Sequence, residues 1–256
     1  MEINQAFTIL KSAGGIRAAR IICDNTKKLT RFKVWRMAHA LRRGVPVAKI
    51  INQKWFYGLQ FYTNKYTLDP RPDTETLVAA VIADCGVGAK PRILDLGTGT
   101  GCIIGAIAKN VAGASGVAID KSLRATRVAK KNMHDLGLGD RVRVLHCSFN
   151  RPYDFGSPFD IIVSNPPYIA RGDMRVDAGA RHDPKTALYA KNNGLAAYQI
   201  IAKNAKDWIK RGGKLYLEIG VGQDAEIKNI FESEKWTFSR AERDLGGIVR
   251  VLVFTI

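Results

Sequence analysis

One stretch, residues 159–168, constrains the fold more than any other part of the chain, because an apolar run stops there at an asparagine and two prolines (FDIIVSNPPY). The β-branched run Ile161–Val163 has no polar alternation, which is typical of a strand buried on both faces of a sheet. Since proline lacks an N–H and fixes its own φ, Pro166 and Pro167 predict a stiff loop directly after this strand. Open α/β sheets bind ligands at the carboxyl ends of their strands. We therefore expect Asn165, with one acceptor and two donors in its side chain, to lie in a binding site.

Segments with the patterns of strands and helices alternate around this stretch. Strands are expected at residues 92–96, 116–120, 142–146, 214–219, 236–240 and 248–254, and helices at 123–133, 195–211 and 225–234. Such alternation predicts an α/β fold with a mostly parallel sheet.

A glycine-rich loop follows the strand at 92–96 and is the candidate cofactor site. Its residues are Gly97, Thr98, Gly99, Thr100 and Gly101. Glycines let the backbone approach a ligand where side chains would clash. A dinucleotide-binding loop would have a glycine or alanine at the position of Cys102, so this loop better suits a ligand that lacks a pyrophosphate.

Two further residues at strand ends are cofactor candidates. Asp120 closes the next strand about twenty residues after the glycine loop, where a carboxylate meets ribose hydroxyls in this topology. An N-cap role for the helix at 123–133 is compatible with that function. Phe149 follows the third strand and is placed to flank a flat aromatic ring.

The chain divides by composition into three parts. Residues 1–52 predict a basic helical domain, with apolar residues at helical spacing such as Val34, Met37, Ala38 and Leu41. Residues 53–67 are rich in aromatic and β-prone residues around Gly58 and predict a linking β-hairpin, and residues 68–256 form the α/β domain. The net charge of +17 points to a polyanionic partner such as RNA or a ribonucleoprotein, or equally to a solvated basic surface.

Other features narrow the class of protein. The cysteines, at positions 23, 85, 102 and 147, are scattered, which indicates reduced thiols rather than a disulfide framework or a metal site. No apolar run is long enough to span a membrane, and the N-terminus lacks the regions of a secretory signal. We expect a cytoplasmic protein that binds neither a membrane nor a metal.

Taken together, the glycine loop, Asp120 and Asn165–Tyr168 resemble those of a class I methyltransferase that uses S-adenosylmethionine. Residues 70–75 (PRPDTE), 183–195 (DPKTALYAKNNGL) and 212–220 (GGKLYLEIG) are similar, in order, to segments of the peptide-chain release factor glutamine methyltransferases. The match runs from about Gly44 to the C-terminus. It implies a Rossmann-like sheet of seven strands with the last antiparallel, S-adenosylmethionine as donor and S-adenosylhomocysteine as product. It also implies methyl transfer to the glutamine side chain of the Gly-Gly-Gln motif in release factors.

The resemblance also assigns roles to individual residues. It implies catalytic roles for Asn165, Pro166 and Tyr168, substrate contacts from Asn165, Pro166, Pro167, Tyr168 and Arg71, and cofactor contacts from Gly97 to Gly101, Asp120, Phe149 and Asn165. The amide nitrogen of glutamine is a poor nucleophile, so we expect Asn165 Oδ1 and the Pro166 carbonyl to accept its N–H bonds and to position it, without a strong base. Ser148 departs from the family pattern, because many members have an aspartate there that accepts the adenine amino group.

Three hypotheses follow. The first is a protein glutamine methyltransferase whose partner is a peptide-chain release factor. The second is a methyltransferase of base amino groups in ribosomal or transfer RNA, favoured by the charge. The third is a non-catalytic ribosome-binding module with the same fold. We take the first, with RNA or ribosome contact through the basic N-terminal region, and expect a monomer.

Overall fold

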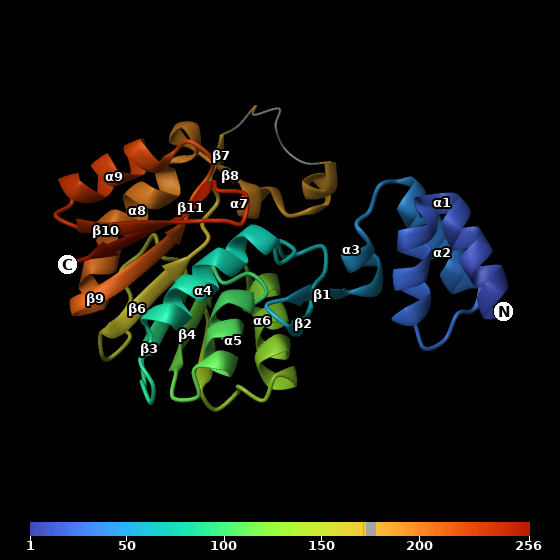
Figure 1. The fold of residues 1–256 in the computed structure, drawn as a ribbon, viewed down its shortest axis with the longest axis horizontal. Helices are drawn as coiled ribbons and strands as arrows, with labels where there is room; N and C mark the ends of the chain where they lie inside the picture. Colours follow the sequence, from blue (N-terminus) through green and yellow to red (C-terminus); the bar gives the residue numbers. More distant parts are fainter. Residues whose placement is uncertain (171, 173–177) are drawn as a thin grey trace.

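A seven-stranded sheet forms the centre of the protein in the computed structural model, which describes residues 1–170, 172 and 178–256 (Figure 1). Its strands, in the order in which they lie side by side, are β10 (Thr237–Arg243), β11 (Val249–Thr255), β9 (Ile209–Glu218), β6 (Phe159–Ser164), β3 (Arg92–Leu96), β4 (Ser115–Asp120) and β5 (Val142–His146). The pairs from β9 to β5 are parallel, and β11 is antiparallel to both of its neighbours. The predicted mostly parallel, Rossmann-like sheet is confirmed.

The strands that follow β3 in the sequence lie on both sides of it in the sheet, and this arrangement sets the position of the site. β4 and β5 follow on one side of β3, whereas β6 and β9 lie on the other. A strand order that reverses in this way opens a crevice at the carboxyl ends of the strands. Leu96 of β3 and Ser164 of β6 are paired at these ends, and the Ser164 hydroxyl donates to the Leu96 carbonyl oxygen over 2.8 Å. Gly97, the first residue of the glycine loop, and Asn165 therefore follow neighbouring strands at the same level of the sheet.

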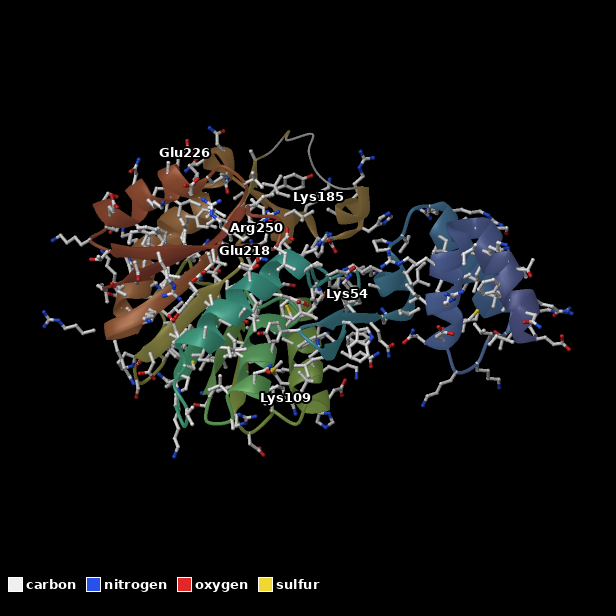
Figure 2. All side chains as sticks on the ribbon, viewed as in Figure 1. Lys54, Lys109, Lys185, Glu218, Glu226 and Arg250 are labelled. Carbon is white, nitrogen blue, oxygen red and sulfur yellow. The ribbon has the colours of Figure 1, made fainter. Side chains whose placement is uncertain are left out.

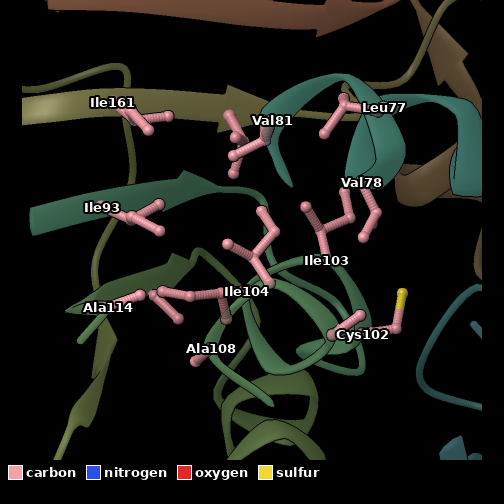
Figure 3. Packing of buried hydrophobic residues seen from close by; sticks show 14 of the residues in the cluster. Leu77, Val78, Val81, Ile93, Cys102, Ile103, Ile104, Ala108, Ala114 and Ile161 are labelled. Atoms are coloured by element: carbon pink, nitrogen blue, oxygen red, sulfur yellow. The ribbon is translucent and has the colours of Figure 1, made fainter. Parts of the chain in front are cut away.

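Helices cover both faces of the sheet (Figure 1). α4 (Glu75–Asp84), α5 (Cys102–Asn110) and α6 (Leu123–Asp135) pack on one face, and α8 (Ala196–Asn204) and α9 (Asp224–Ser233) on the other. Figure 3 shows the first face, where Leu77 of α4, Ile104 of α5 and Ile161 of β6 belong to one hydrophobic cluster. The next residue, Ile162, belongs to the core of the opposite face. Because β6 is buried on both faces, its sequence has no polar alternation.

The N-terminal region has a hydrophobic core of its own. α1 (Ile3–Asp24), α2 (Arg31–Arg42) and α3 (Val47–Ile51) share a cluster that is separate from the two clusters on the sheet. Gly15 interrupts α1 with a φ of +85°. This unit lies at one end of the molecule, joined to the sheet through a hairpin (Figure 1). The domain limits at residues 52 and 67 remain a prediction.

The linking hairpin consists of β1 (Gln53–Phe56) and β2 (Leu59–Tyr62). Tyr57 and Gly58 connect the strands with φ angles of +49° and +71°, the pattern of a two-residue turn that matches the twist of the strands. Phe56 and Phe61 are buried in the core of the α4–α6 face. These two aromatic residues therefore pack the hairpin against the sheet domain.

Short elements connect β6 to α8. They are β7 (Ile169–Ala170), the 3₁₀ turn Ala178–His182, α7 (Lys185–Leu188), β8 (Tyr189–Ala190) and the 3₁₀ turn Asn192–Gly194. Another 3₁₀ turn, Pro72–Thr74, precedes α4.

The helix predicted at 195–211 is shorter than expected, and the strand after it is longer. α8 ends at Asn204, one 3₁₀ turn follows (Ala205–Asp207), and β9 begins at Ile209 rather than at Lys214. Ile209 is paired with Phe159 of β6, and the Phe159 N–H donates to the Trp208 carbonyl oxygen over 2.8 Å. Trp208 and Ile209 are buried and continue the apolar spacing of the helix. The periodicity therefore did not distinguish the two structures, and a pairing with a distant strand decided between them.

Three further observations concern the described residues. The four cysteines are free thiols. No group of histidine, cysteine, aspartate and glutamate residues in the described part of the chain is arranged to hold a metal ion. Of the helices within residues 1–170, 172 and 178–256, none combines the length and the apolar character that a membrane span requires.

Candidate active site

Four neighbouring parallel strands reach the same level of the sheet at their carboxyl ends, where four residues lie in a row across the strands. The paired residues at these ends, from β4 through β3 and β6 to β9, are Ile119, Leu96, Ser164 and Leu217. The residues that follow them are, in the same order, Asp120, Gly97, Asn165 and Glu218. Neighbouring strands lie about 4.8 Å apart, so the row crosses the site at intervals of roughly that distance.

The glycine loop uses its own N–H groups within the protein. Gly97, Gly99 and Gly101 have φ angles of +74°, +57° and +79°, which other residues rarely adopt. Four N–H groups of the loop donate to protein oxygens: those of Gly97 and Thr98 to Ile119, that of Gly99 to Asp120 and that of Gly101 to Thr98, over 2.8–3.0 Å. A phosphate-binding loop would instead direct such donors at the ligand.

Asp120 and Phe149 lie against this loop, and their cofactor roles remain a prediction. Asp120 Oδ2 accepts the Gly99 N–H over 3.0 Å, and Oδ1 accepts the Ser122 N–H over 2.8 Å. Burial raises the pKa of the Asp120 carboxyl, although these hydrogen bonds oppose the shift. Phe149 Cε1 lies 3.8 Å from the position that a Cβ of Gly97 would occupy, so the ring lies against the loop. The N-cap of α6 is Ser122, whose hydroxyl accepts the Ala125 N–H.

A buried carboxyl group lies beneath the loop. Asp95 is fully buried, and its Oδ2 accepts the Thr98 hydroxyl over 2.6 Å, so this threonine side chain points into the protein. Asp95 Oδ1 has no hydrogen-bond partner within the described residues. Burial raises the pKa of Asp95 to about 7. The sequence analysis assigned it no role, although an acid inside the apolar run of β3 was the available signal.

A cavity of about 660 Å³ opens on the other side of Asn165. Asn165, Tyr168 and Arg71 line it, whereas the described residues around it do not include the glycine loop, Asp120 or Phe149. Asn165 Nδ2 donates to the Thr74 hydroxyl over 3.1 Å. Pro166 is buried and Pro167 is half-buried, and neither residue lines the cavity. In the row of strand ends, Asn165 thus lies between Gly97 of the glycine loop and Glu218, which lines this cavity.

Tyr168 is fixed through its backbone and its ring. Its carbonyl oxygen accepts Gln223 Nε2 over 3.1 Å and would lie 2.2 Å from a Cβ on Gly194, so the backbone approach requires glycine there. Burial raises the pKa of the Tyr168 hydroxyl, and the Glu218 charge raises it further. The hydroxyl is therefore neutral and is available only as a hydrogen-bonding group.

Arg71 is held at the cavity by an ion pair. Its Nη2 lies 2.9 Å from Asp183 Oδ2, and Asp183 Oδ1 lies 2.9 Å from Lys49 Nζ. Lys49 also pairs with Asp69 over 2.9 Å. The Lys49 and Asp183 side chains are 5% and 1% exposed. This network connects α3 of the N-terminal unit to the cavity wall, which the sequence analysis did not foresee.

Glu218 is the functional candidate that the sequence analysis missed most clearly. The residue is 2% exposed, lines the cavity, and has no partner for Oε2 among the described residues. Burial raises its pKa to about 7, although hydrogen bonds from Thr74 and Asn165 oppose the shift. Figure 2 shows Glu218 beside Arg250, whose charge also lowers this pKa. The sequence signal was an acid that closes the otherwise apolar end of β9.

Known proteins resemble the chain at several levels. Residues 71–183 match the model of the methyltransferase small domain. The release factor glutamine methyltransferase of Bradyrhizobium diazoefficiens is 37% identical over 95% of this chain and 84% of its own, and that of Agrobacterium fabrum is 41% identical over 82% and 74%. The bifunctional methyltransferase of Rickettsia felis is 36% identical over 82% of this chain, which spans only 45% of that longer protein. The structure of a methyltransferase from Pyrococcus furiosus shares the fold, with a TM-score of 0.57 and 18% identity over 78% of this chain and 90% of its own.

Proposed function

The chain belongs to the family of release factor glutamine methyltransferases, and we propose that it transfers a methyl group from S-adenosylmethionine to the glutamine side chain in the Gly-Gly-Gln motif of a peptide-chain release factor. The observation that carries this proposal is the position of Asn165 between the glycine loop and the cavity, with Nδ2 engaged by Thr74. Its Oδ1 is then left to accept a hydrogen bond from a substrate in the cavity.

The residues present fit S-adenosylmethionine. This compound carries an ammonium group and no phosphate, and the N–H groups of the glycine loop that would suit a phosphate are already used within the protein. The carbonyl oxygens of Gly97 and Gly99 accept no hydrogen bond from the described residues and remain as acceptors for an ammonium group. Asp120 would accept from the ribose hydroxyls, and Phe149 would stack on the adenine. Ser148 cannot supply the carboxylate that the family resemblance leads us to expect beside the adenine amino group.

The chain's own residues position the substrate amide. When bound, S-adenosylmethionine supplies an electrophilic methyl group on its sulfonium. The lone pair of an amide nitrogen is delocalised, so reactivity depends on alignment more than on a base. Asn165 Oδ1 and the Pro166 carbonyl would accept the two N–H bonds and hold the nitrogen in line with the methyl group. Tyr168 would close one side of the site. The products are N5-methylglutamine, S-adenosylhomocysteine and a proton.

Transfer of a labelled methyl group tests this proposal. We expect label from S-adenosylmethionine on the release factor, and none when its Gly-Gly-Gln glutamine is replaced by alanine. Asn165→Ala should reduce kcat by at least about 100-fold, the typical effect of removing one such hydrogen bond, and leave cofactor affinity largely intact. Asn4→Ala, an exposed asparagine in α1, serves as the matched control. Equal turnover by Asn165→Ala would refute the role of this residue, and label on RNA alone would overturn the choice of substrate.

The N-terminal unit presents a surface that favours a second partner, RNA. Four residues at helical spacing, Phe32, Trp35, Arg36 and His39, form what we name the α2 stripe. Phe32 and Trp35 are 67% and 61% exposed. The Trp35 and His39 rings stack with centroids 5.7 Å apart, and the Arg36 guanidinium lies 5.8 Å from the Phe32 ring. Exposed aromatic faces beside arginine are the elements with which proteins stack on unpaired bases.

The charge around the α2 stripe is almost entirely positive. Residues 1–52 contain two acids, Glu2 and Asp24. Their exposed cations are Lys11, Arg17, Arg20, Lys27, Lys28, Arg31, Lys33, Arg36, Arg42 and Arg43. A surface of this composition complements a polyanion. We therefore propose that the α2 stripe contacts single-stranded RNA, in addition to the transfer reaction.

Fluorescence anisotropy with a labelled single-stranded RNA tests the second proposal. Trp35→Ala should weaken binding by about tenfold, because base stacking contributes ~1–3 kcal/mol per base. Trp55→Ala is the matched control, since this indole is 64% exposed but lies in the hairpin, outside the stripe. Unchanged RNA affinity in Trp35→Ala would overturn the RNA assignment. Reduced transfer to the release factor in the same variant would assign the stripe to that protein.

A further inference from the structure

The orientation of the Asn165 amide decides whether the site can work as proposed. A substrate amide donates N–H bonds, so Asn165 must present Oδ1 to the cavity and keep Nδ2 turned away. Thr74 alone does not fix this choice, because a hydroxyl group donates as readily as it accepts. A group that only accepts hydrogen bonds is needed next to Nδ2, and Glu218 occupies that position.

We propose that Glu218 is a positioning residue: its carboxylate accepts hydrogen bonds from Asn165 Nδ2 and the Thr74 hydroxyl, and so holds Asn165 Oδ1 toward the cavity. This inference rests on the proposed transfer to a glutamine amide. Leu217 of β9 is paired with Ser164 of β6, so the residues that follow them, Glu218 and Asn165, leave adjacent strands at the same level. Thr74, from the turn before α4, lies between the two side chains and hydrogen-bonds to both.

The fold alone does not require an acid at position 218. Its neighbours at the end of β9, Leu215, Leu217 and Ile219, are apolar and buried. A buried acid with one unpartnered oxygen destabilises the folded state, and a leucine would fill this place at lower cost. An acid at this position is explained if the carboxylate oxygens of Glu218 orient the side-chain amide of Asn165.

The charge state of Glu218 controls this effect. An ionised carboxylate only accepts hydrogen bonds, whereas a protonated one carries an O–H that can donate to Asn165 Oδ1 and turn the amide around. The pKa of Glu218 is raised to about 7, first by burial and then by Asp73, while Thr74, Arg250 and Asn165 oppose the shift. Other ionisable groups that interact with it are Tyr168, Tyr198 and Cys102. Because a raised pKa means that the acid is protonated below about pH 7, the productive orientation is favoured above that pH.

Nuclear magnetic resonance of the free enzyme tests the orientation without any reaction. The side-chain amide signal of Asn165 is assigned by its loss in Asn165→Ala and followed from about pH 5.5 to 8.5. We expect the wild-type signal to shift with a midpoint near 7, and the shift to disappear in Glu218→Gln. Glu226→Gln, an exposed acid of α9 labelled in Figure 2, should leave the titration unchanged. An Asn165 signal that titrates identically in wild type and Glu218→Gln would overturn the proposal.

Steady-state kinetics supply a second readout. The kcat/KM of wild type for the release factor should rise from pH 6 to 8, and this rise should be smaller in Glu218→Gln. Asp95, whose pKa is also raised to about 7, is present in both proteins, so the difference between the profiles isolates Glu218. Glu218→Leu and Thr74→Val should lower kcat/KM about tenfold, the factor expected from ~1.4 kcal/mol, with the Kd for S-adenosylmethionine unchanged. Thr74→Ser, which restores the hydroxyl, should recover activity.

The possible results separate this inference from the proposed function. Wild-type kcat/KM in both Glu218→Leu and Thr74→Val would refute the role of Glu218 even if the release factor is the substrate. No transfer by wild type to the release factor would refute the proposed function, and the amide titration would still decide whether Glu218 orients Asn165.

Discussion

Replacing Lys49 by methionine should destabilise the protein by about 3 kcal/mol, because Lys49 neutralises two buried carboxylates. Its Nζ lies 2.9 Å from both Asp69 Oδ1 and Asp183 Oδ1, and the Asp69 and Asp183 side chains are 9% and 1% exposed. Removing one partner of a buried ion pair typically costs about 3–5 kcal/mol, since the remaining charge is left unpaired. Lys49 Nζ also donates to the carbonyl oxygens of Asn64 and Thr67, which would lose this donor.

The lower end of this range applies because each carboxylate keeps another donor. Asp183 retains Arg71 Nη2 at 2.9 Å, and Asp69 retains the Thr63 hydroxyl at 2.6 Å. Methionine has nearly the length of the lysine stem, so little packing is lost. For a chain of this size, about 3 kcal/mol corresponds to a fall in Tm of roughly 6–12 °C.

Thermal unfolding followed by circular dichroism measures the effect. Lys33→Met is the matched control, because this lysine is exposed in α2, and we expect its Tm to stay within about 2 °C of wild type. Adding Asp183→Asn to Lys49→Met should recover part of the loss by removing one unpaired charge. A Lys49→Met protein with the Tm of Lys33→Met would refute the reasoning that this network joins the N-terminal unit to the sheet domain.

Three further predictions concern packing and the proposed cofactor-binding residues. Gly116→Ala should lower the free energy of unfolding in urea by about 2 kcal/mol or more, because the added Cβ would lie 2.1 Å from the Ile93 carbonyl oxygen. Gly139→Ala is the control, since no atom lies within 4 Å of its Cβ position, and equal stability of the two variants would contradict the argument. Phe149→Ala should raise the Kd for S-adenosylmethionine by roughly 5- to 10-fold in calorimetry, with Phe32→Ala as control, and an unchanged Kd would exclude stacking. Ser148→Asp should lower the same Kd severalfold, since an added hydrogen bond contributes about 1 kcal/mol, and weaker binding would show that a carboxylate at this position does not reach the adenine amino group.

Local sequence patterns predicted the features that depend on local chemistry. The uninterrupted apolar run of β6 indicated burial on both faces, and its two core neighbours, Ile161 and Ile162, belong to opposite faces of the sheet. The prolines after Asn165 and the glycines after β3 placed the two loops, since these residues limit or extend the backbone angles directly. The resemblance to a family then joined the loops into one site.

Features that depend on tertiary pairing were not predictable in the same way. Thr74 and Asn165 are 91 positions apart, and neither residue indicates the other in the sequence. The sequence indicated that Lys49 is one of many cations in a basic region, whereas in the structure it is buried between two acids. The end of α8 was placed too late because the pairing of Ile209 with Phe159 overrode a helical pattern that the sequence itself continues.

Two buried acids, Asp95 of β3 and Glu218 of β9, lie at the carboxyl ends of the strands that form the site. Asp95 lies beneath the glycine loop and Glu218 beside Asn165, and each has one oxygen without a partner among the described residues. An unpaired buried oxygen destabilises a fold, so such groups are retained where their hydrogen bonds direct neighbouring groups. Asp95 holds Thr98 inward and thereby shapes the loop, and Glu218 at the end of β9 acts on Asn165, which follows the adjacent strand β6. If this reasoning holds, Asp95→Asn should change the Kd for S-adenosylmethionine, and Glu218→Gln the pH dependence of transfer, with neither variant showing the other's defect.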